Sequence, residues 1–599
     1  MKKKIVCLLL ALVMAFGMIS VLASCDDDPV DGECKNHVDE NKDGKCDVCK
    51  EPMGDEVCKT HKDADGDKKC DKCGADVEGG DGPVPIVYPW DSAKILVQMT
   101  KCTNQQELPS GAERYLAGED ASAIEEIDTM VQERNTNAFL ETSVQASYQY
   151  WPDVPKDYGL GKNIERIFTN TSSGSTKDTP DVYNCFVLDM IGTSLKGSLA
   201  NLYSTKYGSG ELAGLNYFEF NNSDYDETKD NRGYMFDYMQ STTLSQKKLY
   251  VLASDYYIDM IRAFYIVPVN VALLEAALKS DKVTTGDYDG NGSLNIDDFY
   301  AEVKDKKWNY DKVAEYSAAV YSNDSGVTGG SIDDVLGFAA AANGLSSSGM
   351  LYTTNITIIN REWDESANDY KYSYPADNPG LYTMCDNLKL LFDKTGVFCV
   401  SSNYSDYGET PLLAIRTRFC QSKVLFGGVI LLGSLEYDAY QELKGGDGFG
   451  VVPVPFYHEV ETDSDEKYLT SIHNVGRPGG IAKNTTKFAQ CTAFLNYQST
   501  NSTDILNFYY DYKLQYDVAD GSKGTVEMLQ YIRSNVRSAF DKNFEDAIGS
   551  KNESEESRWA TIIASEKYQL DIRSDYSTYY PEKEAQLASL VIEYDQFPG

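Results

Sequence analysis

Short continuous apolar runs alternate with apolar stripes of helical spacing along most of the chain, which predicts alternating strands and helices. The run KILVQM, residues 94–99, is typical of a buried strand. In the segment that follows, Ile124, Ile127 and Val131 recur at the i, i+3 and i+7 positions of an amphipathic helix. The run AFLETSVQA, from Ala138, predicts a second strand. Strand, helix and strand at this spacing form a βαβ unit, so we expect a parallel sheet.

The same alternation continues toward the C terminus. PDVYNCFVLDM, residues 180–190, predicts a buried strand, and TSLKGSLANLY, residues 193–203, predicts the helix after it. Residues 249–278 carry few charges, which is typical of a strand that passes through a core and continues into a helix. Residues 472–497 predict strand, turn and helix, and residues 500–599 are predicted to be mostly helical. The predicted fold class is therefore α/β.

The N terminus has the pattern of a secretory signal. Three lysines follow Met1, and an apolar run from Ile5 to about Leu22 leads into the small-residue stretch LASC. This stretch resembles the lipobox of bacterial lipoproteins, in which the cysteine, here Cys25, carries a lipid. We expect this lipid to be the only anchor, at the outer face of the cytoplasmic membrane, because no later segment offers about 18 consecutive apolar residues. The alternative is an ordinary signal peptide that happens to contain a cysteine.

Two copies of the spacing C-x2-H-x8-C-x2-C follow, 24 residues apart. Three thiolates and one imidazole can surround Zn2+ tetrahedrally, and such a site would be structural because four protein ligands leave no open position. The residues between each histidine and the second cysteine also begin like a calcium loop, and cysteines outside the cell can instead form disulfides. The predicted zinc ligands or disulfide partners are Cys34, His37, Cys46, Cys49, Cys58, His61, Cys70 and Cys73.

The chain is predicted to divide into segments of different kinds. We expect a signal peptide (1–24), an acidic spacer (25–33), the tandem repeats (34–76), a Gly/Pro-rich linker (77–92) and a long body (93–599). The repeats would then serve as a stapled stalk that holds the body off the membrane.

A second candidate metal site is the stretch DYDGNGSLNIDD, residues 287–298. It matches the spacing of a calcium-binding loop, with Gly292 at the sharp turn and Asp298 in place of the usual final glutamate. The loop resembles those of dockerin modules, although these occur in tandem and only one loop is found here. We expect a structural calcium site that braces an insertion, and the alternative is a solvated acidic turn. The predicted ligands are Asp287, Asp289, Asn291, Ser293, Asn295 and Asp298.

Charge, hydropathy and the motifs that occur in the chain exclude several classes of function. The 599 residues carry a formal net charge of -38, which disfavours nucleic acid or an anionic membrane surface as a partner. A mean hydropathy of -0.42 excludes a polytopic membrane protein. The chain has 4 histidines, and the body contains no nucleophile-elbow or phosphate-loop motif. The sequence therefore gives little support for catalysis, and we expect that the chain is not an enzyme.

Several body segments, in order, resemble the family 1 extracellular solute-binding proteins, the maltose-binding type of ABC-importer receptor. The likeness covers most of the chain from about Lys94 to Tyr497 as scattered motifs. Ser422 and Val269 depart from the pattern, because the family usually has glycine and an aromatic residue there. The motifs are PDV (180–182) leading to Asp189, PVNVALL (268–274), the stretch 419–425, DGFGVVPVP (447–455) and GIAK (480–483).

The resemblance implies a two-lobed type II periplasmic-binding fold with hinge crossings. Lobe 1 would comprise about 93–260 and 456–510, and lobe 2 about 265–450 with C-terminal helices 511–599. It also implies capture of a small solute, which we expect to be a sugar or oligosaccharide, by a monomer that delivers it to ABC permease subunits. The alternatives are a non-transport surface glycan-binding or adhesion lipoprotein and, with least support, a glycan-active enzyme.

Candidate ligand-binding residues follow from where loops would face a cleft between two lobes. Aromatic faces stack on sugar C–H surfaces, and carboxylates bind hydroxyl groups. Trp151 follows the second predicted strand and Asp189 follows the third, both at positions where cleft loops begin. Trp363 and Arg477 are further candidates. For any one of the aromatic residues, ordinary core packing is the alternative.

Overall fold

The computed structural model describes residues 86–599 with gaps. The chain divides into two compact units, Met1–Val87 and Tyr88–Gly599, and the description that follows concerns the second. The predicted signal peptide, Cys25 and the two cysteine-rich repeats lie outside the described residues and stay predictions. The gaps are 102–107, 109–113, 119–125, 153–161, 174–178, 222–232, 289, 329, 402–409, 445–447, 519–522, 538–539, 552–558, 565–567, 570 and 598–599.

The first sheet contains the predicted βαβ unit. Strands β1 (Ala93–Lys101) and β2 (Val144–Pro152) pair in parallel and are joined by α3 (Glu126–Thr142). Strand β3 (Val182–Asn184) pairs in parallel with the other side of β1, and β12 (Gly479–Ile481) pairs antiparallel with β3. The sheet order is β12-β3-β1-β2. The α/β class and the parallel pairing predicted for the βαβ unit are confirmed, whereas β12 makes the sheet as a whole mixed.

The strand predicted from Ala138 begins later than expected. Ala138 belongs to α3, in which Ile127, Val131, Arg134 and Ala138 are buried. These positions are spaced by four, three and four residues, so the buried stripe of the helix continues about two turns beyond Val131, the last position of the predicted stripe. Ser143, with φ 54°, ends the helix, and β2 starts directly after it.

The segment predicted as strand and then helix after Pro180 is also shifted. Strand β3 covers only three residues, and α5 (Val187–Leu195) starts where the strand was expected to continue. The helix predicted for 193–203 is wrong beyond Leu195. Gly197 adopts φ 60°, a conformation that favours glycine and stops the helix.

The second sheet is mixed and lies in a later part of the chain. Its order is β10-β4-β9-β5-β8, and β11 pairs with β4. Strand β5 pairs in parallel with β8 and β9, whereas β4 pairs antiparallel with β9, β10 and β11. The strands are β4 (Tyr265–Asn270), β5 (Leu336–Ala341), β8 (Val397–Val400), β9 (Val424–Phe426), β10 (Ile430–Leu431) and β11 (Phe449–Val452).

We name residues 93–262 and 479–508, which surround the first sheet, the first lobe, and residues 265–452 the second lobe. The helices of the first lobe, besides α3 and α5, are α2 (Arg114–Ala117), α4 (Lys162–Ser172), α6 (Phe236–Gln240), α7 (Asp259–Arg262), α15 (Phe488–Thr500) and α16 (Thr503–Phe508), with short η1 (Gly210–Leu212) and η2 (Glu219–Asn221).

The second lobe also carries a β-hairpin, β6 (Asn360–Asp364) and β7 (Asp369–Ser373), outside its main sheet. Its helices are α8 (Val271–Leu278), α9 (Ile296–Lys304), α10 (Tyr310–Val320), α11 (Gly344–Tyr352), α12 (Pro379–Phe392), α13 (Pro411–Cys420), α14 (Asp438–Lys444) and the short η4 (Leu432–Glu436).

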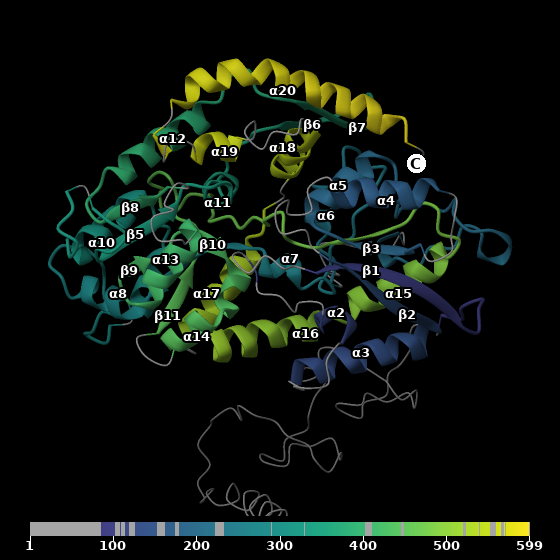
Figure 1. Ribbon diagram of the computed structural model, residues 1–599, viewed down its shortest axis with the longest axis horizontal. Coiled ribbons are helices and arrows are strands. Elements are labelled where there is room, and N and C mark those ends of the chain that lie inside the picture. The colour runs from purple at the N-terminus through teal and green to yellow at the C-terminus, as the bar shows by residue number, and fades with distance from the viewer. Residues whose placement is uncertain are drawn as a thin grey trace, which may run out of the picture. The chain divides into compact units, whose positions relative to one another are not determined.

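The remaining C-terminal helices contact both lobes. Helix α17 packs on β11 and α9 of the second lobe, α18 on α5 of the first, and α20 on α12, β7 and α5 (Figure 1). The mostly helical C terminus predicted from the sequence is confirmed. No described helix is long and apolar enough to cross a membrane. These elements are η5 (Tyr509–Val518), α17 (Lys523–Ser534), α18 (Phe540–Lys551), α19 (Trp559–Ala564) and α20 (Ile572–Asp595).

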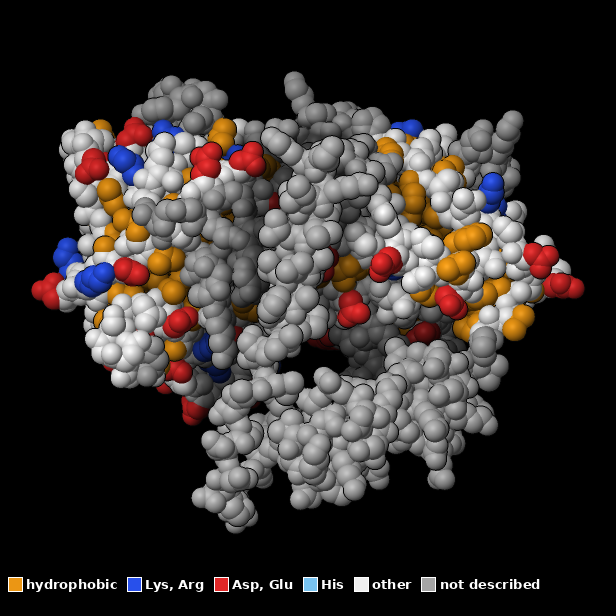
Figure 2. Space-filling view, turned by 90° about the horizontal axis from the view of Figure 1, so that it is seen from below, with side chains coloured by type: hydrophobic (Ala, Val, Ile, Leu, Met, Phe, Trp, Pro, Cys, Tyr) orange, Lys and Arg blue, Asp and Glu red, His pale blue; other side chains and the backbone are white. Residues whose placement is uncertain are grey.

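Charged side chains are spread over the surface of the described residues. Figure 2 shows acidic side chains on both halves of one face, with fewer basic side chains among them and no single basic patch on the described atoms of that face. This distribution fits the net charge of -38.

Candidate functional site

The carboxyl ends of β1, β2 and β3 bring candidate residues together at one edge of the first sheet. Thr100 and Trp151 lie near the ends of β1 and β2, and Tyr183 lies in β3. Ligand sites of open α/β sheets form at this edge, where the connecting loops begin. We call the group formed here the edge cluster; its members are Thr100, Trp151, Asn163, Arg166, Tyr183, Cys185 and Asp189.

Helix α4 links two of the residues predicted from the sequence. Its Asn163 donates from Nδ2 to Oδ2 of Asp189 at 2.8 Å. Asp189 lies in the first turn of α5, where the helix dipole favours a carboxylate, and its exposed fraction is 0%. The carboxylate is therefore held in a fixed orientation by an amide on the neighbouring helix.

One turn further along α4, Arg166 covers the ring of Trp151. The guanidinium carbon lies 3.7 Å from the ring centroid, and Tyr183 packs near the indole with a centroid distance of 5.8 Å. Trp151 is 2% exposed, whereas Arg166 itself is an exposed residue. Burial lowers the pKa of Arg166, against the opposing effect of Cys185 and Tyr183.

Cys185 belongs to a closed ring of hydrogen bonds beneath this edge. Thr100 Oγ1 donates to Cys185 Sγ at 3.2 Å, the thiol donates to Gln98 Oε1 at 3.1 Å, and Gln98 Nε2 donates to Thr100 Oγ1 at 3.1 Å. Burial, followed by the charge of Asp189, raises the pKa of the Cys185 thiol. The thiol therefore stays protonated near neutral pH, and its chemistry is that of a structural donor rather than a nucleophile.

Arg477 lies next to the edge cluster, but its guanidinium already pairs with other groups in a buried ion network. Its guanidinium pairs with Asp259 and donates to the backbone oxygen of Thr100. The side chain is buried, and its segment precedes β12 on the return from the second lobe to the first. The structure thus places Arg477 where it fixes the return crossing against the end of β1.

The same network continues to the second lobe through Arg262. Its guanidinium binds Asp259 at 2.7 Å and both oxygens of Glu436, from η4, at 2.9 and 2.8 Å. Tyr509 donates to the same Glu436. Burial alone would lower the pKa of Arg262, but Glu436 and Asp259 outweigh it and the pKa is raised. We call Asp259, Arg262, Glu436, Arg477 and Tyr509 the hinge network.

Trp363 lies apart from the other three predicted residues. It is in β6, where its ring contacts Tyr370 of β7 with a centroid distance of 5.2 Å, and it is 39% exposed. The structure therefore brings Trp151, Asp189 and Arg477 to the same edge of the first sheet and places Trp363 on the hairpin of the second lobe.

The predicted calcium loop folds as a tight turn before α9. Both carboxylate oxygens of Asp287 accept backbone N–H bonds, from Asn291 at 3.1 Å and Gly292 at 2.8 Å. Gly292 adopts φ 82°, as the sharp turn of such a loop requires. Asp298 forms a capping box with Asn295 at the start of α9. Asp289 lies outside the described residues, and among those described no group of three or more His, Cys, Asp or Glu side chains is placed to hold a metal.

Sequence reasoning missed Asn163, Arg166 and Glu436. Asn163 and Arg166 are three positions apart, on one face of α4, a spacing that is visible in the sequence. No feature of the nearby sequence indicates that this face of α4 contacts Trp151 and Asp189. Glu436 pairs with Arg262 across 174 positions, a contact that only the fold creates.

No known protein family matches the sequence, and no curated protein does either. Similar solved structures include the galacto-N-biose-/lacto-N-biose I-binding protein of an ABC transporter from Bifidobacterium longum, 10% identical, covering 85% of this chain and 99% of that chain, TM-score 0.46. The cyclic alpha-maltosyl-1,6-maltose binding protein of Arthrobacter globiformis is 10% identical in sequence. The similarity covers 84% of this chain and 99% of that chain, with a TM-score of 0.43. A third, 12% identical and covering 84% and 100%, TM-score 0.41, is a family 1 extracellular solute-binding protein of Bifidobacterium longum subsp. infantis, the family whose motifs this sequence resembles.

Proposed function

We propose that the chain is a solute-binding receptor of type II architecture that holds a small solute, a carbohydrate, beside the carboxyl edge of its first sheet. The observation that carries this proposal is the edge cluster. Trp151 and Asp189, which are distant in sequence, both meet α4 at the edge where ligand sites of α/β sheets form. The chain crosses from the first lobe to the second through α7 into β4 and returns before β12.

The chemistry of the cluster favours a saccharide. An indole ring offers a flat face for sugar C–H groups, and the amide of Asn163 and the carboxylate of Asp189 offer a donor and acceptors for hydroxyl groups. The negative charge of the protein suits a neutral solute better than an anionic one. Arg166 would protect the ring in the solute-free protein and leave it when the sugar binds.

Delivery and location follow from the sequence. The motifs that resemble ABC-importer receptors support transfer of the solute to permease subunits, and Cys25 in its lipobox supports lipid attachment at the outer face of the cytoplasmic membrane. The receptor would then act next to the permease that it supplies.

A thermal-shift screen of the full chain against mono- and oligosaccharides tests the proposed solute class. We expect at least one saccharide to raise the midpoint of unfolding, because a ligand that binds only the folded state stabilises it by mass action. Amino acids and short peptides form the control panel. A shift produced only by that panel would contradict the carbohydrate class, and no shift from either panel would contradict solute binding.

We also propose that the 287–298 loop holds a calcium ion. Asp287, Asn291 and Asp298 would supply oxygens that keep a second lone pair free beside their backbone hydrogen bonds. We expect calorimetric titration to show calcium binding that Asp287→Asn weakens at least about tenfold, while magnesium binds more weakly because it demands stricter geometry. Equal heats for the wild type and Asp287→Asn would contradict the site.

A further inference from the structure

Helix α20 bridges the two lobes. It has 24 residues and is therefore about 36 Å long. At its first turns, Arg573 pairs with Asp386 of α12 at 2.7 Å, and the hydroxyl of Tyr576 donates to the backbone oxygen of Pro375 at 2.7 Å. Figure 1 shows α20 running from α12 in the second lobe to the vicinity of α4 and α5 in the first.

The other end of α20 is fixed to the first lobe. Tyr594 is 1% exposed, its ring packs against Tyr250 with a centroid distance of 5.8 Å, and its hydroxyl contacts Thr243. Lys248 donates from Nζ to the backbone oxygen of Tyr594 at 2.9 Å. A Cβ added to Gly197 would lie 2.7 Å from the ring of Phe597, so the residues after α20 also pack closely on the end of α5.

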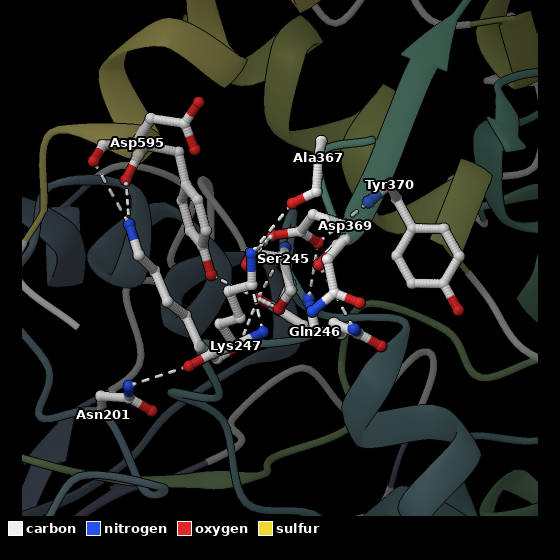
Figure 3. Close-up of polar contacts among 12 residues, drawn as sticks. Asn201, Ser245, Gln246, Lys247, Ala367, Asp369, Tyr370 and Asp595 are labelled. Carbon is white, nitrogen blue, oxygen red and sulfur yellow. Dashed lines mark hydrogen bonds and ion pairs between the residues drawn. The ribbon is translucent and has the colours of Figure 1, made fainter. Parts of the chain in front are cut away.

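The β6–β7 hairpin reaches the same part of the first lobe, as Figure 3 shows. At its turn, Asp369 accepts hydrogen bonds from the hydroxyl of Ser245 at 2.5 Å and from the backbone N–H of Gln246 at 3.1 Å. Lys247 donates to the backbone oxygen of Ala367 at 3.2 Å. Residues 243–250, which we call the landing segment, thus receive both α20 and the hairpin.

The landing segment is hydrogen-bonded to other parts of the first lobe. Asn201 accepts the backbone N–H of Leu249 at 3.0 Å, and Leu252, just beyond the segment, pairs with Gly479 of β12. Forces on the landing segment are therefore transmitted to the first sheet.

Helix α20 also holds α18 against the candidate site. Lys583 of α20 pairs at 2.9 Å with Glu545 of α18, and both side chains are buried. Glu545 also accepts from the hydroxyl of Tyr352, in α11 of the second lobe, at 2.9 Å. On its other side α18 packs against α5, the helix that carries Asp189. Asp189 is 0% exposed, so a solute can reach its carboxylate only if neighbouring elements move, and α18 is one of the elements packed against α5.

We propose that the C-terminal end of α20 and the turn of the β6–β7 hairpin form a latch that holds the lobes closed and must leave the landing segment before solute can exchange. This inference rests on the proposed function for the identity of the occupant. The latch itself is a property of the solute-free chain. Its strength comes from the carboxylate of Asp369 and the buried ring of Tyr594, which contact the landing segment, and from the ammonium of Lys248, which binds the end of α20.

Hydrogen exchange measured by mass spectrometry on the full chain without solute tests the latch. We expect the double variant Asp369→Ala/Lys248→Met to exchange about tenfold faster in the landing segment, in α18 and in the first turn of α5, because each lost charge-assisted bond favours opening. Asp364→Asn is the matched control, since Asp364 pairs with Lys371 inside the hairpin at 2.6 Å and its bonds to Ser366 also stay there. Unchanged exchange in α18 and α5, or faster exchange confined to the hairpin, would overturn the latch.

A second arm separates the latch from the proposed function. With a saccharide that binds the wild type, the double variant should release it about tenfold faster in stopped-flow displacement, whereas Asp364→Asn should not. If no saccharide binds either protein, the carbohydrate proposal fails while the solute-free exchange still decides the latch. If hydrogen exchange in the double variant is also faster in β1 and β2, the variant has lost global stability. The single variant Asp369→Asn then replaces it, and faster or unchanged exchange in α18 and α5 supports or overturns the latch as before.

Discussion

Replacing Glu436 by leucine is expected to lower the free energy of unfolding by about 3–5 kcal/mol. The substitution leaves Arg262, which is 1% exposed, without the bidentate partner that balances its desolvation. The guanidinium cannot lose its proton to escape this cost, because arginine stays protonated in proteins, and Asp259 must then stabilise the charge without Glu436. Equilibrium unfolding in guanidinium chloride measures the loss.

The double variant Arg262→Met/Glu436→Leu serves as the internal control. Removing both charges together should recover most of the loss, since an apolar pair of similar volume can replace a buried ion pair at little cost. Asp386→Asn, which weakens the exposed pair with Arg573, should change the free energy of unfolding by about 1 kcal/mol or less. A Glu436→Leu effect as small as that of Asp386→Asn would show that the hinge network does not fix the crossing between the lobes.

Replacing Asp189 by asparagine is expected to weaken solute binding by about 10- to 100-fold. The change keeps the size of the side chain but removes the charge that strengthens hydrogen bonds to sugar hydroxyl groups. Asn163 can still donate to the remaining amide oxygen, so α4 and α5 should stay packed. Titration calorimetry with a saccharide found by thermal shift measures the affinity, and thermal unfolding confirms that the variant is folded.

Glu275→Gln is the matched control, because it removes an exposed carboxylate of α8 in the second lobe, where Glu275 pairs with Lys279 of the same segment. It should bind the saccharide with the affinity of the wild type. Equal affinity for Asp189→Asn and wild type would remove Asp189 from the site. An equal loss in both variants would show that overall charge, rather than a specific contact, governs binding.

The sequence predicted those parts of the fold that local pattern determines. The run at 94–99 is β1, the stripe beginning at Ile127 is α3, and the two strands that they connect are parallel. The predicted ends of helices and strands were wrong where one sequence pattern fits both a helix and a strand. Ala138 begins an apolar run whose pattern predicts a strand. It also continues the buried stripe of α3, and the packing of that stripe favours the helix.

Part of the candidate site could also be predicted from local sequence pattern. Trp151 and Asp189 could be placed near one sheet edge because parallel strands end together there. Their common contact with α4 could not be predicted, since a helix position shows its facing partner only after the chain has packed. Arg477 was expected near the ligand, whereas the structure pairs it with Asp259, 218 positions away, a contact that depends on how the return crossing meets the first lobe.

Calorimetric titration of the full wild-type chain with the saccharide that gives the largest thermal shift tests the central claim most directly. The account predicts saturable binding of one solute per chain, at least about tenfold weaker in Asp189→Asn and unchanged in Glu275→Gln. Absence of saturable binding by any saccharide, or binding that Asp189→Asn leaves unaltered, would contradict a carbohydrate site at the carboxyl edge of the first sheet.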